Sequence, residues 1–117
     1  MMYEIERLGD IAVVVRDGNK EPVAFGGIWL KSGELCGVYV SPEHRGKGLE
    51  KFILARLTHV ATVHKIPRLH MKIRWTAPFI AAWLLRAGKP FHIRHFHWFE
   101  VDTQDMTAFL TRRVKIR

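Results

Sequence analysis

The stretch from residue 34 to residue 75 most constrains the fold, because the spacing of its apolar residues changes twice. Glu34 to Val40 is rich in Val and Tyr, as strands are, and Ser41-Pro42 ends it because proline lacks the N–H that a sheet ladder needs. From Lys47 apolar residues recur every three or four positions, which predicts an amphipathic helix. Leu69 to Trp75 then alternates apolar and polar residues like a half-buried strand. Two strands joined through a helix are expected to be parallel, with a right-handed crossover.

The residues before this unit predict antiparallel strands. Ile11 to Arg16 and Pro22 to Leu30 are β-branched or apolar runs, and the turn-forming Asp17-Gly18-Asn19 joins them into a hairpin. A second turn at Lys31-Ser32-Gly33 leads into the strand at Glu34. The chain is therefore expected to open as an antiparallel meander.

After Trp75 the pattern predicts a second helix that starts at Thr76 or Pro78 and ends at Gly88. Phe91 to Val101 is predicted to be one further strand. A short last helix follows, for which the next residues, Asp102 or Thr103, supply an N-terminal cap. The predicted fold class is α+β: a mixed, mainly antiparallel sheet with helices on its faces, in a single domain over residues 1–117.

Composition narrows the classes of function. The 19 Lys and Arg against 11 Asp and Glu give a formal charge of +8, which favours anionic partners of any kind. The single cysteine, Cys36, cannot form an internal disulfide, and no apolar run reaches the roughly 18 residues of a membrane span. We therefore expect a cytoplasmic protein that binds no membrane, and nucleic-acid binding only of a non-specific kind.

The chemistry is predicted to lie in the loop Arg45-Gly46-Lys47-Gly48-Leu49, between the strand and the first helix. Glycines let the backbone approach an anion, and the first-turn N–H groups of a helix have no helical partners. The two cations add full positive charges. The loop thus suits a phosphate ligand, although the same glycines would also serve a plain strand-to-helix turn.

The run from Val38 to Leu49 resembles the central motif of the GNAT N-acetyltransferase superfamily, in which a strand leads into Gln/Arg-x-x-Gly-x-Gly/Ala. The resemblance continues through Phe52-Ile53-Leu54 and reaches Trp83-Leu84-Leu85-Arg86-Ala87-Gly88, covering roughly residues 22 to 99. It implies a GNAT-like fold without the N-terminal strand and helices of that family, and a site for acetyl-CoA.

By this resemblance, the strand residues hold the pantetheine and acetyl group through their backbone, and the loop N–H groups bind the pyrophosphate. The implied cofactor-binding residues are Val38, Tyr39, Val40, Arg45, Gly46, Lys47, Gly48 and Leu49. Glu34, eleven residues before Arg45, falls where several members keep the glutamate that deprotonates the acceptor amine. A solvent-exposed turn residue is the other interpretation of Glu34.

Three positions depart from the family pattern. Glu50 stands where the family has Gly or Ala, and its carboxylate would oppose the pyrophosphate if it faced the cofactor. Leu84 stands where the family has a tyrosine acid, and Thr76 or Ala77 replaces the asparagine that often opens that helix. The short N-terminal region further predicts an acceptor side that is open or completed by another chain.

Several histidines and aromatic residues lie near the C-terminus, but their pattern predicts neither a metal site nor a base-stacking site. His92, His95 and His97 could not converge on a metal from one strand, because His92 would face away from the other two. No metal site is therefore predicted. The aromatic residues are expected to pack in the core rather than to stack on bases.

Two hypotheses for function remain open at this point, and a third is weaker. The first is an acetyl-CoA-dependent N-acetyltransferase acting on an amine of a protein or polyamine by direct attack. The second is a catalytically degenerate GNAT-fold protein with a structural, assembly or inhibitory role, as in small viral GNAT-like proteins, which would place it in the virion or the host cytoplasm. The third is an electrostatic nucleic-acid binder. A protein partner or a homo-oligomer could complete the acceptor side.

Overall fold

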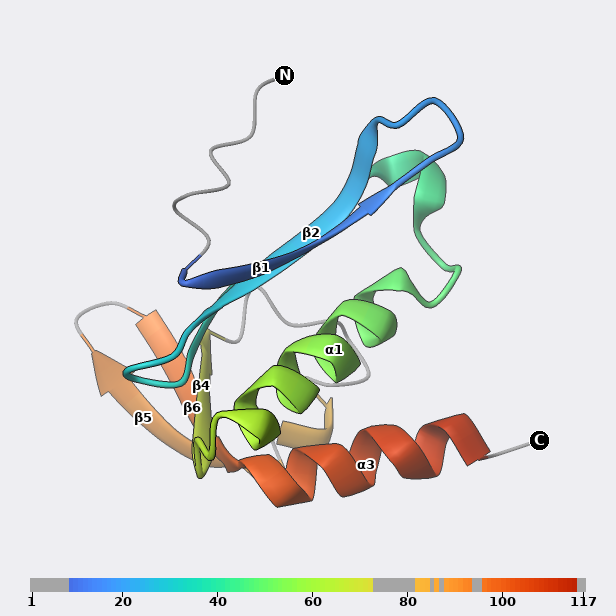
Figure 1. Ribbon diagram of the computed structural model, residues 1–117. Helices are drawn as coiled ribbons and strands as arrows, with labels where there is room; N and C mark the ends of the chain where they lie inside the picture. Colours follow the sequence, from blue (N-terminus) through green and yellow to red (C-terminus); the bar gives the residue numbers. More distant parts are fainter. Residues whose placement is uncertain (1–8, 73–81, 85, 87, 94–95, 116–117) are drawn as a thin grey trace.

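The computed structural model describes residues 9–72, 82–84, 86, 88–93 and 96–115 (Figure 1). In this part of the chain, six strands form one sheet in the order β1-β2-β3-β4-β6-β5, and only the β3–β4 pair is parallel. The strands are β1 (Ile11–Arg16), β2 (Pro22–Trp29), β3 (Glu34–Val40), β4 (Arg68–Lys72), β5 (Lys89–Ile93) and β6 (Phe96–Asp102). The helices with described bounds are α1 (Leu49–Val63), α3 (Thr103–Lys115) and a 3-10 turn at Pro42–His44, and residues 82–84 and 86 are also helical. The predicted fold class is confirmed.

The first three strands follow the sequence prediction closely. β1 and β3 have the predicted bounds, and β2 ends at Trp29, one residue before the predicted end. Asp17 shapes the hairpin turn, since its Oδ1 accepts hydrogen bonds from the backbone N–H groups of Asn19 and Glu21. The local turn chemistry therefore sets the register of β1 on β2.

One predicted strand is wrong: the run from Phe91 to Val101 forms two antiparallel strands, β5 and β6, rather than one. The run contains no Gly, Pro, Asn or Asp, so nothing in it signals a turn. The register sets His92 of β5 opposite His97 of β6, so these two residues lie on different strands. The prediction that placed them on a single strand is therefore also wrong, while His95 lies outside the described residues.

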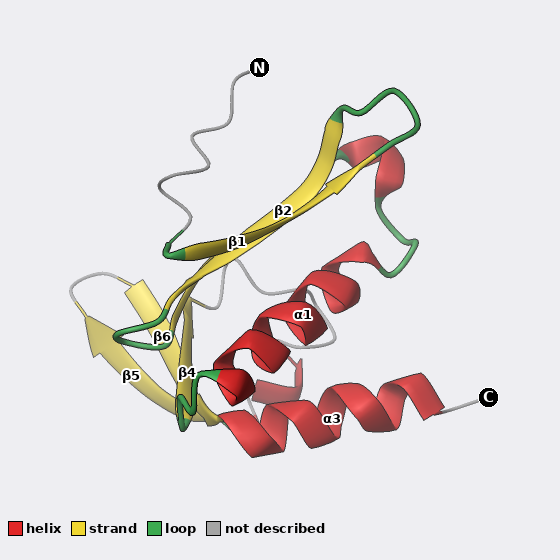
Figure 2. Ribbon diagram, viewed as in Figure 1, coloured by secondary structure: helices red, strands yellow, loops and turns green. Residues whose placement is uncertain are grey.

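Helices α1 and α3 contact each other and lie on the same face of the sheet (Figure 2). The core fills the space between them and the inward-facing strand residues. Its fully buried side chains include Ile28, Ile53, Leu54, Leu57, Leu69, Leu84 and Met106. Asp102 caps α3 as predicted, because its Oδ1 accepts hydrogen bonds from the N–H groups of Gln104 at 2.8 Å and Asp105 at 3.3 Å.

A bulge bends β3 in its middle. Gly26 of β2 stands opposite Val38, but Ile28 stands opposite Leu35, so β3 carries one extra residue between these two pairs. Gly37 takes up this residue with a φ of 98°, a conformation that favours glycine. Bulges strengthen the local twist, and here the bulge begins just where β3 leaves β4.

Strands β3 and β4 are joined at one end only. Glu34 and His70 are paired, and the N–H of His70 donates to the carbonyl of Gly33 at 3.0 Å. Lys72 would stand opposite Cys36 if the parallel ladder continued, but these two residues are not paired. Beyond Glu34, the β4-facing edge of β3 thus has no ladder partner in the described part of the chain.

Helix α1 ends in a Schellman motif that has a lysine where glycine is usual. The N–H of Ile66 donates to the carbonyl of Ala61, and the N–H of Lys65 donates to that of Thr62. Lys65 adopts the left-handed conformation that the motif requires, with a φ of 57°. Its Cβ makes this conformation costlier than it would be for glycine.

We expect Lys65→Gly to raise the free energy of unfolding by about 1 kcal/mol, because glycine adopts a positive φ without steric cost. The melting temperature should rise by about 4 °C. Lys51→Gly is the control: Lys51 lies within α1, so glycine there should lower the stability by about 1 kcal/mol. Equal destabilisation by both substitutions in thermal melts would contradict the role given to the left-handed Lys65.

Candidate cofactor-binding site

The open edge of β3 presents backbone groups from alternate residues. The N–H of Ser41 donates to the carbonyl of Val23 in β2 at 2.8 Å, so Ser41 faces β2. Because backbone groups alternate in direction along a strand, those of Val40 and Val38 face the open side. Tyr39 faces β2, and its ring stacks on Phe25 with ring centroids 5.1 Å apart. Of the three predicted strand residues, Val38 and Val40 can thus offer polar groups at the edge.

Arg45 ties the loop to the end of β3. Its Nε donates to the carbonyl oxygen of Val40 at 3.0 Å, although the residue itself is exposed. Ser41 and His44 add a second link, with Ser41 Oγ and His44 Nδ1 2.8 Å apart. Arg45 therefore positions the loop. Its hydrogen bond uses the Val40 carbonyl, while the Val40 N–H still faces the open side of β3.

The glycines of the loop are in the conformation that an anion cradle needs. Gly46 and Gly48 have φ values of 81° and 83°, and a Cβ built on either would meet no atom within 4 Å. Gly48 directly precedes α1, whose first N–H groups have no helical partners and carry the positive end of the helix dipole. Lys47 is exposed beside them. The residues present thus fit a pyrophosphate group.

Glu50 lies on the inward side of this first turn. It precedes Ile53, Leu54 and Leu57 by three, four and seven positions, and these three side chains form the buried face of α1. The residue is half-buried, and no hydrogen bond or ion pair involving its carboxylate occurs within the described residues. The conflict between the Glu50 carboxylate and a bound pyrophosphate stays a prediction.

Glu34 stands at the joined end of the two strands. It pairs with Trp29 in β2 and His70 in β4, and its backbone N–H donates to Ser32 Oγ at 3.2 Å. Leu35 is buried in the core, so Glu34 points to the sheet face away from α1. The loop and Glu34 therefore lie at opposite ends of β3.

The structure brings His70 to Glu34, a neighbour that the sequence did not reveal. The parallel register places the two residues side by side on the same sheet face. They are 36 positions apart in the chain. The alternation of apolar and polar residues within Leu69 to Trp75 predicted only that the His70 side chain faces away from the core. Knowing the strand register was the one way to find it.

Cys36 shares the outward face with Glu34. Partial burial, together with the nearby carboxylates of Glu34 and Asp10, raises the pKa of the Cys36 thiol to about 11. A thiol with this pKa stays protonated at neutral pH, so Cys36 is not a nucleophile. Burial is the main cause of the raised pKa, and the negative charge of Glu34 on the same face adds to it.

Leu84, in the position of the family's tyrosine acid, is fully buried in the core. Its carbonyl accepts a hydrogen bond from the N–H of Gly88 at 2.9 Å. The aromatic neighbour Trp83 stacks on Phe109 of α3, with ring centroids 4.6 Å apart. This segment therefore packs against the core, and Leu84 supplies no acid to the site. Residues 76 and 77 lie outside the described residues.

A family model described as the acetyltransferase (GNAT) family matches residues 2–78, which include β1 to β4, the loop and α1. The chain belongs to this family. No curated protein matches the chain significantly. Enzymes of the family transfer an acetyl group from acetyl-CoA to an acceptor amine.

Solved GNAT structures share the fold. An acyl-CoA N-acyltransferase from Klebsiella pneumoniae is 25% identical, with a TM-score of 0.63 over 80% of this chain and 72% of its own. Nourseothricin acetyltransferase is 15% identical, with a TM-score of 0.55 over 79% and 64%. A phosphinothricin acetyltransferase from Sinorhizobium meliloti, solved in complex with AcCoA, is 17% identical, with a TM-score of 0.54 over 78% and 60%. This chain thus spans under two thirds of the last two proteins.

The described residues lack two further kinds of feature. No group of three or more His, Cys, Asp or Glu side chains there is arranged to hold a metal ion. No described helix has the length and apolar character needed to cross a membrane.

We expect substitution of Glu50 to tighten acetyl-CoA binding. Glu50→Gln removes the charge but keeps the size, and Glu50→Ala restores the small side chain of the family pattern. If repulsion dominates, both should lower Kd roughly tenfold in calorimetry, with a smaller gain at high salt. A gain with Ala alone would indicate a steric conflict. Unchanged Kd in both variants would contradict any approach of Glu50 to the ligand.

We expect alkylation of Cys36 by iodoacetamide at pH 8 to run roughly a hundredfold slower than for a thiol of pKa 9, because the raised pKa leaves so little thiolate. Reactivity should appear only as the pH rises toward 11. Glu34→Gln removes one cause of the shift and should speed the reaction, whereas Glu21→Gln, on the exposed hairpin turn, should not. Fast labelling of Cys36 in the folded wild-type protein would contradict the raised pKa of its thiol.

Proposed function

We propose that this chain is an acetyl-CoA-dependent N-acetyltransferase that acetylates an amine by direct attack. The observation that carries the proposal is the single-ended pairing of β3 with β4, beside a loop whose glycines stand open at the start of α1. An extended ligand arm can add to the free edge of β3, and its phosphates then meet the loop. Family membership supports the same assignment.

In this proposal, each element has a defined task. When bound, acetyl-CoA supplies the activated acetyl group. The backbone groups at Val38 and Val40 orient the ligand arm, while Arg45 holds the loop against the strand end and Lys47 adds charge for the phosphates. The N–H groups of the first turn complete the anion site. The positive loop thus anchors the ligand, and the edge of β3 directs it toward the middle of the sheet.

Glu34 is proposed as the general base, directly or through a water. It accepts the proton of the acceptor amine as the nitrogen attacks the thioester carbonyl carbon and the C–S bond breaks. The electron pair leaves with sulfur as a thiolate, which must take its proton from water, because Leu84 carries no acidic group. A missing acid need not abolish transfer, since a thiolate is a good leaving group.

The test is acetyl transfer with free thiol as the readout, using spermidine and a lysine-containing peptide as acceptors. Glu34→Gln should lower kcat/KM by roughly a hundredfold or more, while Kd for acetyl-CoA stays unchanged. Glu21→Gln is the matched control, because it removes an exposed carboxylate remote from the site.

Three outcomes would contradict this proposal in different ways. Unaltered turnover in Glu34→Gln would remove the base assignment. Failure of the wild-type protein to bind acetyl-CoA at millimolar concentration would favour the alternative of a catalytically degenerate GNAT-fold protein. Glu50 and Leu84, which depart from the family pattern, already support that alternative. Binding that appears only in Glu50→Ala would favour the same alternative.

A further inference from the structure

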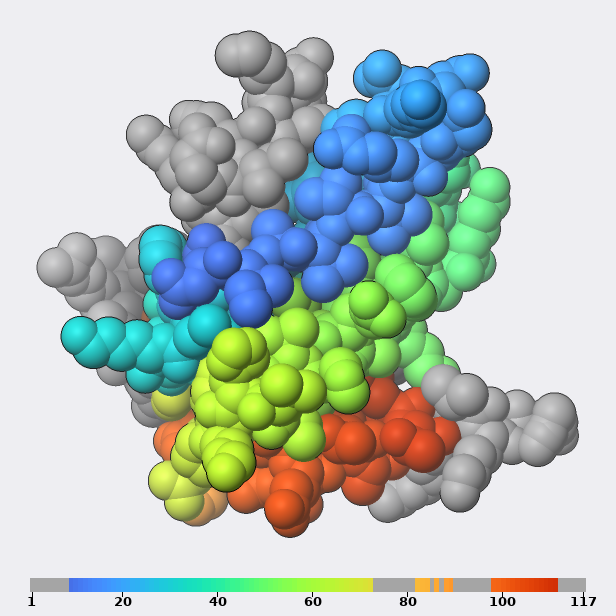
Figure 3. Space-filling model, in the orientation of Figure 1, coloured from blue at the N-terminus to red at the C-terminus, as the bar shows by residue number. Residues whose placement is uncertain are grey.

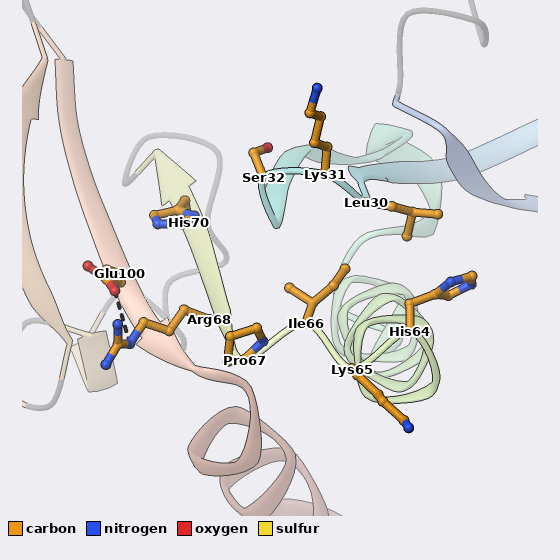
Figure 4. A pocket seen from close by; sticks show the side chains of 10 residues that line it. All are labelled: Leu30, Lys31, Ser32, His64, Lys65, Ile66, Pro67, Arg68, His70 and Glu100. Atoms are coloured by element: carbon orange, nitrogen blue, oxygen red, sulfur yellow. Dashed lines mark ion pairs between the residues drawn. The ribbon is translucent and has the colours of Figure 1, made fainter.

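A cleft of about 500 Å³ opens at the end of the sheet remote from the loop (Figure 4). The loop precedes the N-terminus of α1, whereas the cleft lies at its C-terminus, beside the turn from β2 to β3 and the start of β4. Figure 3 shows the cyan turn and the yellow end of α1 close together on one side of the molecule. Several residues that line this cleft are positively charged or neutral polar.

The floor of the cleft is apolar and its rim is cationic. Ile66 and Pro67 lie at its centre, while the Lys31 and Lys65 side chains extend outward on two sides (Figure 4). Arg68 pairs with Glu100 through its Nε at 3.1 Å, yet its side chain remains 58% exposed. An occupant would thus meet apolar contacts below and two lysines at the rim, with the Arg68–Glu100 ion pair beside them.

The cleft is continued by a second one of about 410 Å³. Lys65, Ile66 and Pro67 line both, and the second cleft reaches Thr103 and Gln104 at the start of α3. Two adjoining clefts that share a wall suit an extended chain better than a compact small molecule. Lys65 stands at their junction.

The first cleft also leads to the proposed base. Ser32 and His70 line it, and both contact Glu34, Ser32 through its hydroxyl and His70 through the sheet register. Glu100 is the partner of His70 on the other side. Two carboxylates therefore flank His70 on the sheet face. Glu100 is paired with Arg68, which leaves Glu34 to attract an ammonium group, while Lys31 and Lys65 lie at the rim.

We propose that this cleft binds the acceptor, and that the acceptor is a peptide segment in which acidic side chains surround the residue that bears the amine. The inference rests on the proposed acetyltransferase function and names its substrate class. The acidic side chains of the segment pair with Lys31 and Lys65, and its amine lies toward Glu34. Opposite charges on the rim and beside the base fix the direction of the segment.

The same features disfavour other acceptors and polyanions. A polyamine brings only positive charge to a rim that is already positive. A single-stranded nucleic acid favours large aromatic side chains on which its bases stack, and the described residues that line the cleft include no Phe, Tyr or Trp. A peptide uses both the apolar floor and the charged rim.

The conformation of Lys65 supports a role for its side chain. Glycine would fit the left-handed position without steric cost, yet the position carries a long cation that points out of the cleft rim.

The test measures anisotropy of a fluorescein-labelled peptide with one lysine between glutamates, without cofactor. Lys65→Glu should weaken binding about fivefold, and Lys31→Glu/Lys65→Glu about tenfold or more. Lys20→Glu is the matched control: it reverses the same charge at another lysine of positive φ, 64°, on the remote hairpin turn, and should change affinity little. Acetyl-CoA titrations of each variant, expected to match wild type, separate this site from the cofactor site.

Several results would overturn the cleft assignment. Equal weakening by Lys20→Glu would show an unspecific charge effect, and tighter binding of a lysine-rich peptide would reverse the predicted charge preference. An oligo-dT that binds tighter than the peptide and loses affinity in Lys65→Glu would make the cleft a nucleic-acid site. If wild type binds acetyl-CoA but not the acidic peptide, this inference fails alone; if it binds the peptide but not acetyl-CoA, the proposed function fails and the cleft stands as a peptide site.

Discussion

The organisation of this molecule depends on the bulge in β3. An extra residue at Cys36 and Gly37 bends the strand just after Glu34 pairs with His70, and the parallel ladder does not continue to Lys72. A continuous ladder would have paired the edge groups of β3 with β4. Because the strands part, the backbone groups of Val38 and the N–H of Val40 stay available to a ligand between β3 and β4.

The divergence of β3 from β4 also separates two positively charged regions, the glycine loop and the cleft beside Lys65. At the open end, the glycine loop and the start of α1 offer N–H groups, Arg45 and Lys47 to an anion. At the joined end, the Schellman motif ends α1 and directs the chain into β4. Lys65 of this motif lines the cleft. Helix α1 connects the two regions, and its buried face holds their distance fixed. One helix thus positions both the proposed donor site and the proposed acceptor site.

Much of the fold could be predicted because local signals and periodicity agree. The hairpin turn at Asp17, the strand at Glu34 and the cap at Asp102 are each encoded within a few residues. The β5–β6 hairpin could not be found, since no turn residue interrupts an aromatic and β-branched run. The anion loop was visible as a motif, whereas the His70 neighbour of Glu34 depends on pairing across 36 residues. Long-range register leaves no local pattern.

The most direct test of the account is an amide NMR titration with acetyl-CoA. We predict that the amide signals of Gly46, Gly48 and Leu49 shift together with those of Val38 and Val40, because one ligand contacts both the loop and the strand edge. Signals from Lys31 and Lys65 should stay in place in the absence of an acceptor. No shift at millimolar ligand, or shifts confined to the cleft around Lys65, would contradict the account.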